Sequence, residues 1–172
     1  MKLDRIHAQP NAATYTIPPI SVLLAEEMCG QPWCDPFAGW NSPAQVTNDL
    51  NPDAPTGSHL DALEFLQGHP RQHFAGVLYD PPYSFGQAKE VYESIGLTTP
   101  ERFTCMDFWA AIRDEITRVV KPAGKVISFG WTSTGMGLAR GFRMDRILLV
   151  PHGGGRNDTI CTVEVLAQAA LL

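Results

Sequence analysis

The sequence contains no apolar run approaching the roughly 18 residues that a helix needs to cross a bilayer. Its first residues, MKLDRIHAQPNAATYT, also lack the apolar core of a secretory signal peptide. These two absences argue against a membrane protein and against export. We therefore expect a cytoplasmic protein.

Cysteine is scarce, and its four occurrences follow no metal-binding pattern. They are Cys29, Cys34, Cys105 and Cys161; none forms a CxxC pair, and no histidine cluster lies near them. Zinc and disulfide roles stay open, but an intracellular chain favours reduced, mostly buried thiols. The sequence therefore predicts no metal site.

Basic residues are outnumbered by acidic ones. The 13 Lys and Arg against 18 Asp and Glu give a net charge of −5, which is not typical of a nucleic-acid binder. Residues 1–80 contain three basic and nine acidic residues, whereas residues 81–172 contain ten and nine. Any basic surface is thus expected in the second half, from Lys121, Lys125, Arg140, Arg143, Arg146 and Arg156. An ordinary solvated surface and a phosphate-facing patch are both compatible with this pattern.

The length of 172 residues suffices for one domain with a hydrophobic core. We expect residues 1–13 to form a loose tail and residues 14–172 to form a single domain. Strand-like stretches alternate with helix-like ones, and residues 145–166 are typical of two strands joined by a glycine-rich turn. This order predicts a mostly parallel α/β sheet with an antiparallel edge hairpin.

One helix is predicted with particular clarity, because residues 106–120 place Phe108, Ile112 and Ile116 on one face. Pro122 and Gly124 are expected to end it. The segment 84–107 before it has no strong apolar period beyond a short helix near its middle. We expect that segment to be mobile and to contact substrate, as long loops beside active sites do.

Acidic residues follow or close the strand-like stretches. Asp35, Asp49, Asp61 and Asp80 all stand at such positions. Any one of them is explained by a helix cap or a turn. Because ligands of parallel sheets bind at the carboxyl ends of the strands, all four together favour a ligand rich in hydroxyl and amino groups.

The same motifs carry a resemblance to a known family. DPFAG at 35–39, ND at 48–49, DALEFL at 61–66 and DPPY at 80–83 resemble the ordered motifs of the S-adenosylmethionine-dependent amino-methyltransferases that modify adenine or cytosine in DNA. The preceding TYTIPPISVLL and the later HGGGRNDT make the chain similar to small phage and prophage adenine-specific DNA methylases. The resemblance implies a Rossmann-like methyltransferase fold with seven strands and helices on both faces, in a bacterial or phage-infected cell.

The resemblance also implies a cofactor site for S-adenosylmethionine. Asp35 and Gly39 would shape the cofactor loop, Asp49 would bind the ribose hydroxyls, and Asp61 would accept from the adenine amine. The implied cofactor-binding residues are Asp35, Pro36, Phe37, Ala38, Gly39, Asp49, Leu50, Asp61 and Ala62.

The implied catalytic residues are Asp80, Pro81, Pro82 and Tyr83. The Asp80 carboxylate and the Pro81 carbonyl would accept from the two N–H groups of a target amine and so direct its lone pair at the methyl donor. The prolines would hold that carbonyl in place. Tyr83 would offer a ring face to a target base that has left the stack. A proline-terminated strand with a capping aspartate also explains Asp80 and Pro81, but it does not explain the aromatic residue.

Substrate contacts are harder to assign. His152 is a candidate for the base pocket or a structural histidine, and Arg156 is a phosphate contact or an exposed turn residue. Trp40 and Trp131 stand near strand ends and are candidates to flank the ligands, with core packing as the default expectation. No segment of about 80 residues is left for a target-recognition domain. DNA recognition would then be weak and salt-sensitive, or would need a second copy of the chain or a separate specificity partner.

Three functions remain open at this point. The first is an adenine-specific DNA methyltransferase that acts on N6. The second is a related enzyme acting on RNA or on cytosine, since DPPY activates any exocyclic amine. The third is a non-catalytic subunit that keeps the cofactor pocket.

Overall fold

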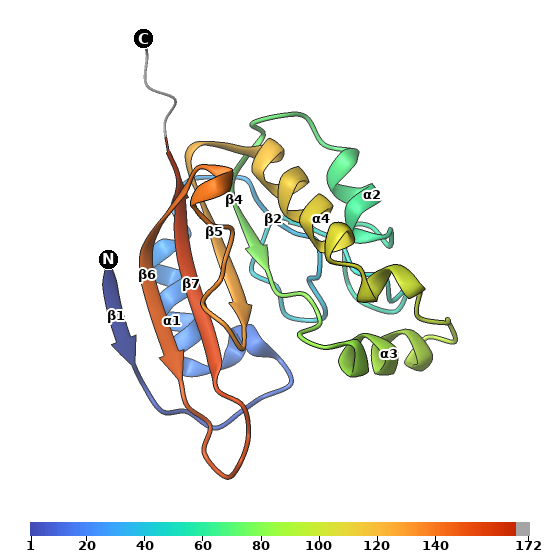
Figure 1. Ribbon diagram of the computed structural model, residues 1–172, viewed down its shortest axis with the longest axis horizontal. Coiled ribbons are helices and arrows are strands. Elements are labelled where there is room, and N and C mark those ends of the chain that lie inside the picture. Colours follow the sequence, from blue (N-terminus) through green and yellow to red (C-terminus); the bar gives the residue numbers. More distant parts are fainter. Residues whose placement is uncertain (168–172) are drawn as a thin grey trace.

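The computed structural model describes residues 1–167, which form a seven-stranded sheet in the order β1-β6-β7-β5-β4-β2-β3 (Figure 1). The strands are β1 (Lys2–Arg5), β2 (Trp33–Asp35), β3 (Val46–Thr47), β4 (Phe74–Tyr79), β5 (Val120–Gly130), β6 (Phe142–Val150) and β7 (Thr159–Leu166). All neighbouring strands are parallel except where β7 pairs with β5 and β6. The predicted mostly parallel sheet with an antiparallel hairpin is confirmed.

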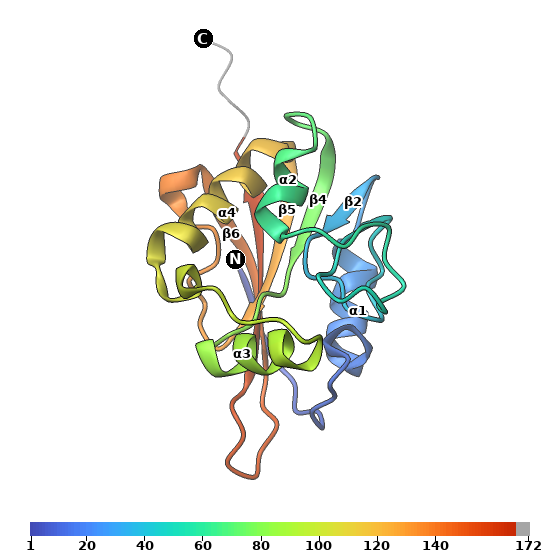
Figure 2. The same cartoon turned by 90° about the vertical axis from the view of Figure 1, so that its right-hand side faces the viewer.

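Helices cover both faces of this sheet, as expected. The α-helices are α1 (Pro18–Glu27), α2 (Ala62–Gln67), α3 (Phe85–Ser94) and α4 (Met106–Val119), and the 3-10 helices are η1 (Thr14–Thr16), η2 (Glu101–Thr104) and η3 (Leu138–Arg140). α1 packs on one face and α2 and α4 on the other, while α3 lies across the end where β4 and β5 finish (Figures 1 and 2).

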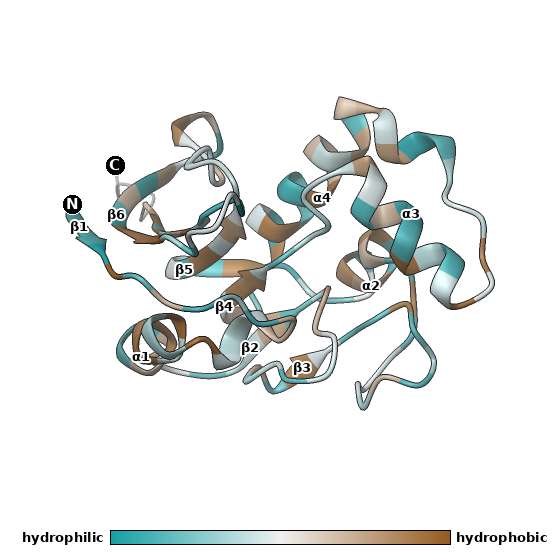
Figure 3. Cartoon of the chain, turned by 90° about the horizontal axis from the view of Figure 1, so that it is seen from below, coloured by the Kyte–Doolittle hydropathy of each residue, from teal (hydrophilic) through white to brown (hydrophobic). Residues whose placement is uncertain are grey.

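The core follows from side chains that alternate between the two faces of buried strands. In β4, Val77 packs toward α2 and α4, whereas its neighbour Leu78 packs toward α1. Apolar residues accordingly gather on β4 and β5, between α1 and α4 (Figure 3). Gly76 leaves room for the buried Trp33 ring, since a Cβ there would lie 2.5 Å from that ring. The central strands are thereby closely packed around one aromatic residue.

The predicted end of α4 is wrong by a few residues. The helix ends at Val119, and Val120 is already extended and paired with Phe74. Pro122 and Gly124 therefore lie within β5, where the register between β4 and β5 shifts. Proline is tolerated at such irregularities because no ladder hydrogen bond is needed there.

The expectation of a loose tail is also wrong for the first residues. Lys2–Arg5 pairs in parallel with β6, so that β1 lies outside the hairpin at the edge of the sheet. Asp4 binds Arg146 of β6 at 2.9 Å, and Arg146 also contacts Glu27 of α1 at 3.2 Å. Three of the four residues of β1 are exposed, which left no apolar alternation from which to predict the strand.

No helix among residues 1–167 combines the length and the apolar character needed to span a membrane.

Candidate functional site

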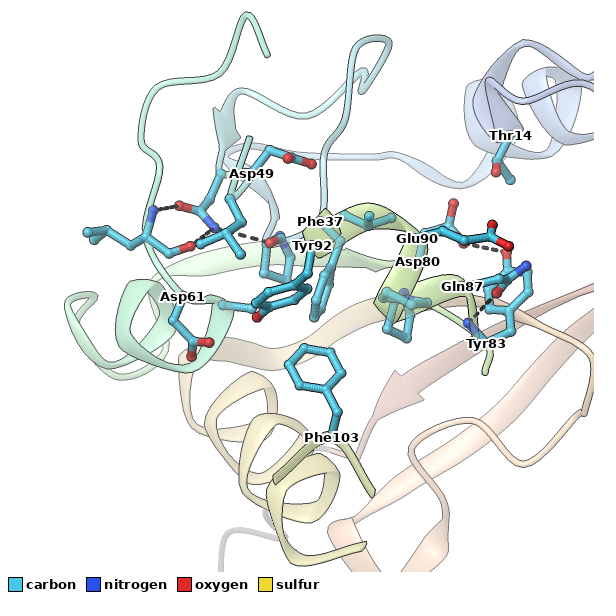
Figure 4. Close-up of a pocket in the computed structure, with 18 of the residues that line it drawn as sticks. Thr14, Phe37, Asp49, Asp61, Asp80, Tyr83, Gln87, Glu90, Tyr92 and Phe103 are labelled. Atoms are coloured by element: carbon cyan, nitrogen blue, oxygen red, sulfur yellow. Dashed lines mark hydrogen bonds between the residues drawn. The ribbon is translucent and has the colours of Figure 1, made fainter. Parts of the chain in front are cut away.

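A cavity of about 380 Å³ opens at the carboxyl ends of β3 and β4 (Figure 4). It brings together residues from all four motifs. The predicted residues that line it are Pro36, Phe37, Asp49, Leu50, Asp61, Ala62, Asp80, Pro81, Pro82 and Tyr83. Its remaining wall comes from the segment before α1 and from α3, η2 and α4, with Thr14, Glu90 and Phe103 among the residues that contribute.

Asp35 lies beneath this cavity and not in it. Its carboxylate is fully buried and accepts from the Tyr15 hydroxyl at 2.7 Å, the Ser42 hydroxyl at 2.6 Å and the Phe37 N–H at 2.9 Å. Burial raises the pKa of Asp35 to about 7, although these three donors oppose the rise. Because its oxygens accept from protein groups, Asp35 does not line the cavity, and its part in cofactor binding stays a prediction. Through Phe37 and Ser42, Asp35 supports the loop after β2 from the protein interior.

Asp49 connects two loops of the cavity. One carboxylate oxygen accepts from the Gly39 N–H at 2.9 Å and the other accepts from the Asn51 N–H at 2.8 Å. Gly39 takes a positive φ of 53°, a conformation that glycine adopts without strain. Ala38 is buried, and neither it nor Gly39 lines the cavity. Each Asp49 oxygen keeps a further lone pair for a ligand.

Asp61 begins α2 and is held from two sides. One oxygen accepts from the Leu63 N–H at 3.0 Å, which caps the helix. The other pairs with Arg102 of η2 at 2.8 Å. The Arg102 guanidinium also lies 5.0 Å from the centre of the Phe108 ring. This salt bridge connects the segment between α3 and α4 to the start of α2, at the cavity.

Asp80 and Tyr83 form the other end of the cavity. Asp80 follows β4 directly, and the Tyr83 hydroxyl donates to its Oδ1. Burial raises the pKa of Asp80 to about 6, and the hydroxyls of Tyr83 and Thr14 lower it in part. Figure 4 shows Thr14 reaching toward this pair from the opposite wall. The site thus holds a carboxylate with an elevated pKa, stabilised by hydroxyl groups.

Comparison with known proteins identifies the fold. No protein-family model matches the chain, and no curated protein matches its sequence. The 1,6-didemethyltoxoflavin-N1-methyltransferase of Burkholderia thailandensis, solved with bound 1,6-didemethyltoxoflavin and S-adenosylhomocysteine, superposes with a TM-score of 0.58 at 13% identity, over 88% of this chain and 77% of that one. TrmN from Thermus thermophilus superposes with a TM-score of 0.55 at 15% identity, over 88% of this chain and 49% of TrmN. The chain has the Rossmann-like methyltransferase fold. It spans about half the length of TrmN.

Several residues contact the site without having been predicted from the sequence, among them Thr14 and Arg102. Thr14 belongs to a segment expected to be no more than the entry to α1, and Arg102 lies 41 residues from its partner Asp61. No local pattern marks either contact.

Trp40 and Trp131, for which core packing is the default expectation, are 61% and 40% exposed. Trp131 packs edge-to-face on Tyr83, with 5.6 Å between the ring centres.

The two candidate substrate residues lie outside the cavity. His152 is buried, with Nδ1 2.9 Å from the Ala8 carbonyl oxygen and Nε2 2.8 Å from the Thr159 hydroxyl. These contacts favour the second of its two predicted roles, a structural histidine that holds the N-terminal segment against the hairpin. Arg156 is exposed at the hairpin tip, at the same end of the molecule as α3 (Figure 1).

Two further basic residues of the second half, Lys125 and Arg140, are paired away from the cavity. Lys125 pairs with Glu27 at 2.7 Å and Arg140 pairs with Asp114 at 2.7 Å. Both stand near the amino ends of parallel strands, opposite the cavity.

The four cysteines divide evenly, since Cys34 and Cys161 are buried and Cys29 and Cys105 are exposed.

Proposed function

We propose that this chain is an S-adenosylmethionine-dependent methyltransferase that transfers a methyl group to the exocyclic N6 amine of adenine in DNA. The observation that carries the proposal is the single cavity lined both by Asp80–Tyr83 and by Asp49 and Asp61. A cofactor-binding half and an amine-binding half thereby face one space. The methyltransferase fold and the S-adenosylhomocysteine bound in the Burkholderia thailandensis enzyme support the cofactor assignment.

The cavity residues fit this cofactor chemically. Carboxylates accept from hydroxyl and amino groups and attract positive charge, which suits a ribose, an adenine amine and a sulfonium. Asp49 would accept from the ribose, and Asp61 would accept from the adenine amine beside Arg102. The volume of about 380 Å³ lies within the range of small-molecule sites. When bound, the cofactor supplies the electrophilic methyl group.

The amine-binding half acts through orientation and electrostatics. The second oxygen of Asp80 and the Pro81 carbonyl would accept from the two N–H groups of the target amine, which turns its lone pair toward the methyl group. Proline at 81 and 82 fixes φ, so the carbonyl stays in position without substrate. Trp131 and Tyr83 together give the flipped base an aromatic surface.

DNA contacts would come from the hairpin that carries Arg156, because the paired basic residues lie elsewhere. Binding would then rest on few phosphate contacts. A second copy of the chain or a separate partner would raise selectivity.

Mass analysis of nucleosides tests the substrate. The protein is incubated with methyl-labelled cofactor and, separately, with DNA, RNA and single nucleosides. We expect labelled N6-methyladenine from DNA, formed on the order of a hundredfold or more slowly by the Asp80→Asn variant. N4-methylcytosine, methylation of RNA alone, or cofactor binding without transfer to any of them would contradict the proposal.

The Asp49→Ala variant tests the cofactor half. We expect affinity for S-adenosylmethionine to fall on the order of tenfold, because a ligand hydroxyl loses its acceptor and the Gly39 loop loses its anchor. Calorimetric titration measures this. Asp53→Ala is the matched control, since Asp53 is exposed in the same loop and does not line the cavity. Equal affinities of Asp49→Ala and wild type would remove Asp49 from the site.

A further inference from the structure

Tyr83 is held in place by more contacts than a stacking surface requires. Its hydroxyl donates to Asp80, and its backbone N–H donates to the Gln87 side chain at 2.7 Å. Ser84, the next residue, caps α3 by accepting from the Gln87 N–H at 3.2 Å. Pro82 restricts the backbone on the other side. The ring is therefore fixed before any substrate arrives, with its hydroxyl on the carboxylate.

We propose that Tyr83 is a positioning residue that acts through its hydroxyl group, which holds the Asp80 carboxylate ionised and leaves one oxygen of that carboxylate for the target amine. This inference rests on the proposed function, in which Asp80 accepts from an amine. A ring that served only as a stacking surface would need no hydroxyl at this position.

The surroundings of Asp80 explain why a hydroxyl donor matters. Within residues 1–167 Asp80 forms no salt bridge. The titratable groups that face it are the Tyr15 and Tyr83 hydroxyls, the Asp35 carboxyl from β2, the Cys161 thiol from β7 and, in the cavity wall, the Glu90 carboxyl from α3. None of these groups carries positive charge at neutral pH, and Asp35 adds negative charge when ionised.

Burial disfavours the ionised form of Asp80, and hydrogen-bond donors are therefore the groups that stabilise it. Tyr83 is the stronger of the two donors that lower the pKa of Asp80, and Thr14 is the other. Burial, and after it the neighbouring Asp80 carboxylate, raise the pKa of Tyr83, so the hydroxyl keeps its proton and remains a donor at neutral pH. A protonated Asp80 would present an O–H group where the amine needs an acceptor.

The Tyr83→Phe variant separates the hydroxyl from the ring. We expect the acidic limb of its kcat/KM profile to move up by about one pH unit, because a carboxylate loses a strong donor. Near pH 6 the rate should fall on the order of tenfold, and above pH 8 most of it should return. Tyr83→Leu, which loses the ring as well, should stay slow at every pH. A Tyr83→Phe profile with the wild-type acidic limb would overturn the proposal.

A direct titration of Asp80 tests the role of the Tyr83 hydroxyl whether or not the protein methylates DNA. NMR follows the signal of the Asp80 carboxyl carbon as the pH changes, in protein that is isotope-labelled at aspartate. The Asp80→Asn variant, which lacks this signal, assigns it. The measurement requires no methyl acceptor. Tyr83→Phe should raise the titration midpoint, and Tyr92→Phe, which changes another tyrosine of the same cavity, should not. A raised midpoint supports the proposal even if DNA is not methylated. An unchanged midpoint overturns it even if DNA is.

Discussion

Replacing Asp80 by asparagine should slow methyl transfer on the order of a hundredfold or more while cofactor binding changes little. The asparagine keeps the shape of the side chain, but it loses the negative charge and turns one acceptor into a donor. Removing one preorganised group at the reacting centre has costs of this size in other enzymes. Single-turnover kinetics with saturating cofactor measure the rate, and calorimetry measures the binding.

A second variant and a control make the result specific. Asp80→Ala should be at least as slow, since it also releases the Tyr83 hydroxyl. Asp107→Asn removes an exposed carboxylate at the start of α4 and should keep wild-type turnover. Near-normal turnover of Asp80→Asn would contradict the assigned role of the carboxylate.

The stability of the protein should fall as the pH rises from about 4 to about 7. Asp35 is fully buried, and burial raises its pKa from 3.8 to about 7. A carboxyl whose pKa is higher in the folded state stabilises it fully below the unfolded pKa, and this stabilisation is lost as pH rises through the folded value. The difference corresponds to about 4 kcal/mol in the free energy of unfolding. Asp80, raised to about 6, contributes in the same direction.

Urea unfolding at several pH values measures this loss, and the Asp35→Asn variant isolates its origin. The neutral amide cannot ionise, so the variant should show a much flatter dependence on pH. His69, whose pKa burial lowers, acts in the opposite direction at low pH, but it does so equally in both proteins. Parallel pH profiles of the two proteins would exclude Asp35 as the cause.

The parts of the site that local chemistry determines were predictable. A proline pair after an apolar run ends a strand, and the aspartate that opens DALEFL caps a helix, so the positions of Asp80 and Asp61 followed from neighbouring residues. The contacts between Arg102 and Asp61, and of Thr14 with the cavity, depend on tertiary packing across many residues and left no periodic signal. His152 shows the same limit, because only the path of the N-terminal segment provides its partner Ala8.

The direction of β7 has a practical consequence for joining this chain to other molecules. Because β7 runs against β5, its last residues return to the amino ends of the parallel strands, whereas β1 begins at the sheet edge opposite the middle of β6, with Lys2 paired to Arg146. Neither end of the described chain lies beside the carboxyl end of β4, since Figure 1 shows the N-terminus at the outer edge of the sheet and the end of β7 at the top, away from α3. A purification tag, a surface linker or a fused DNA-targeting module attached at either end would leave the cavity mouth open. The linker alone would then determine how such a module is oriented relative to the cavity.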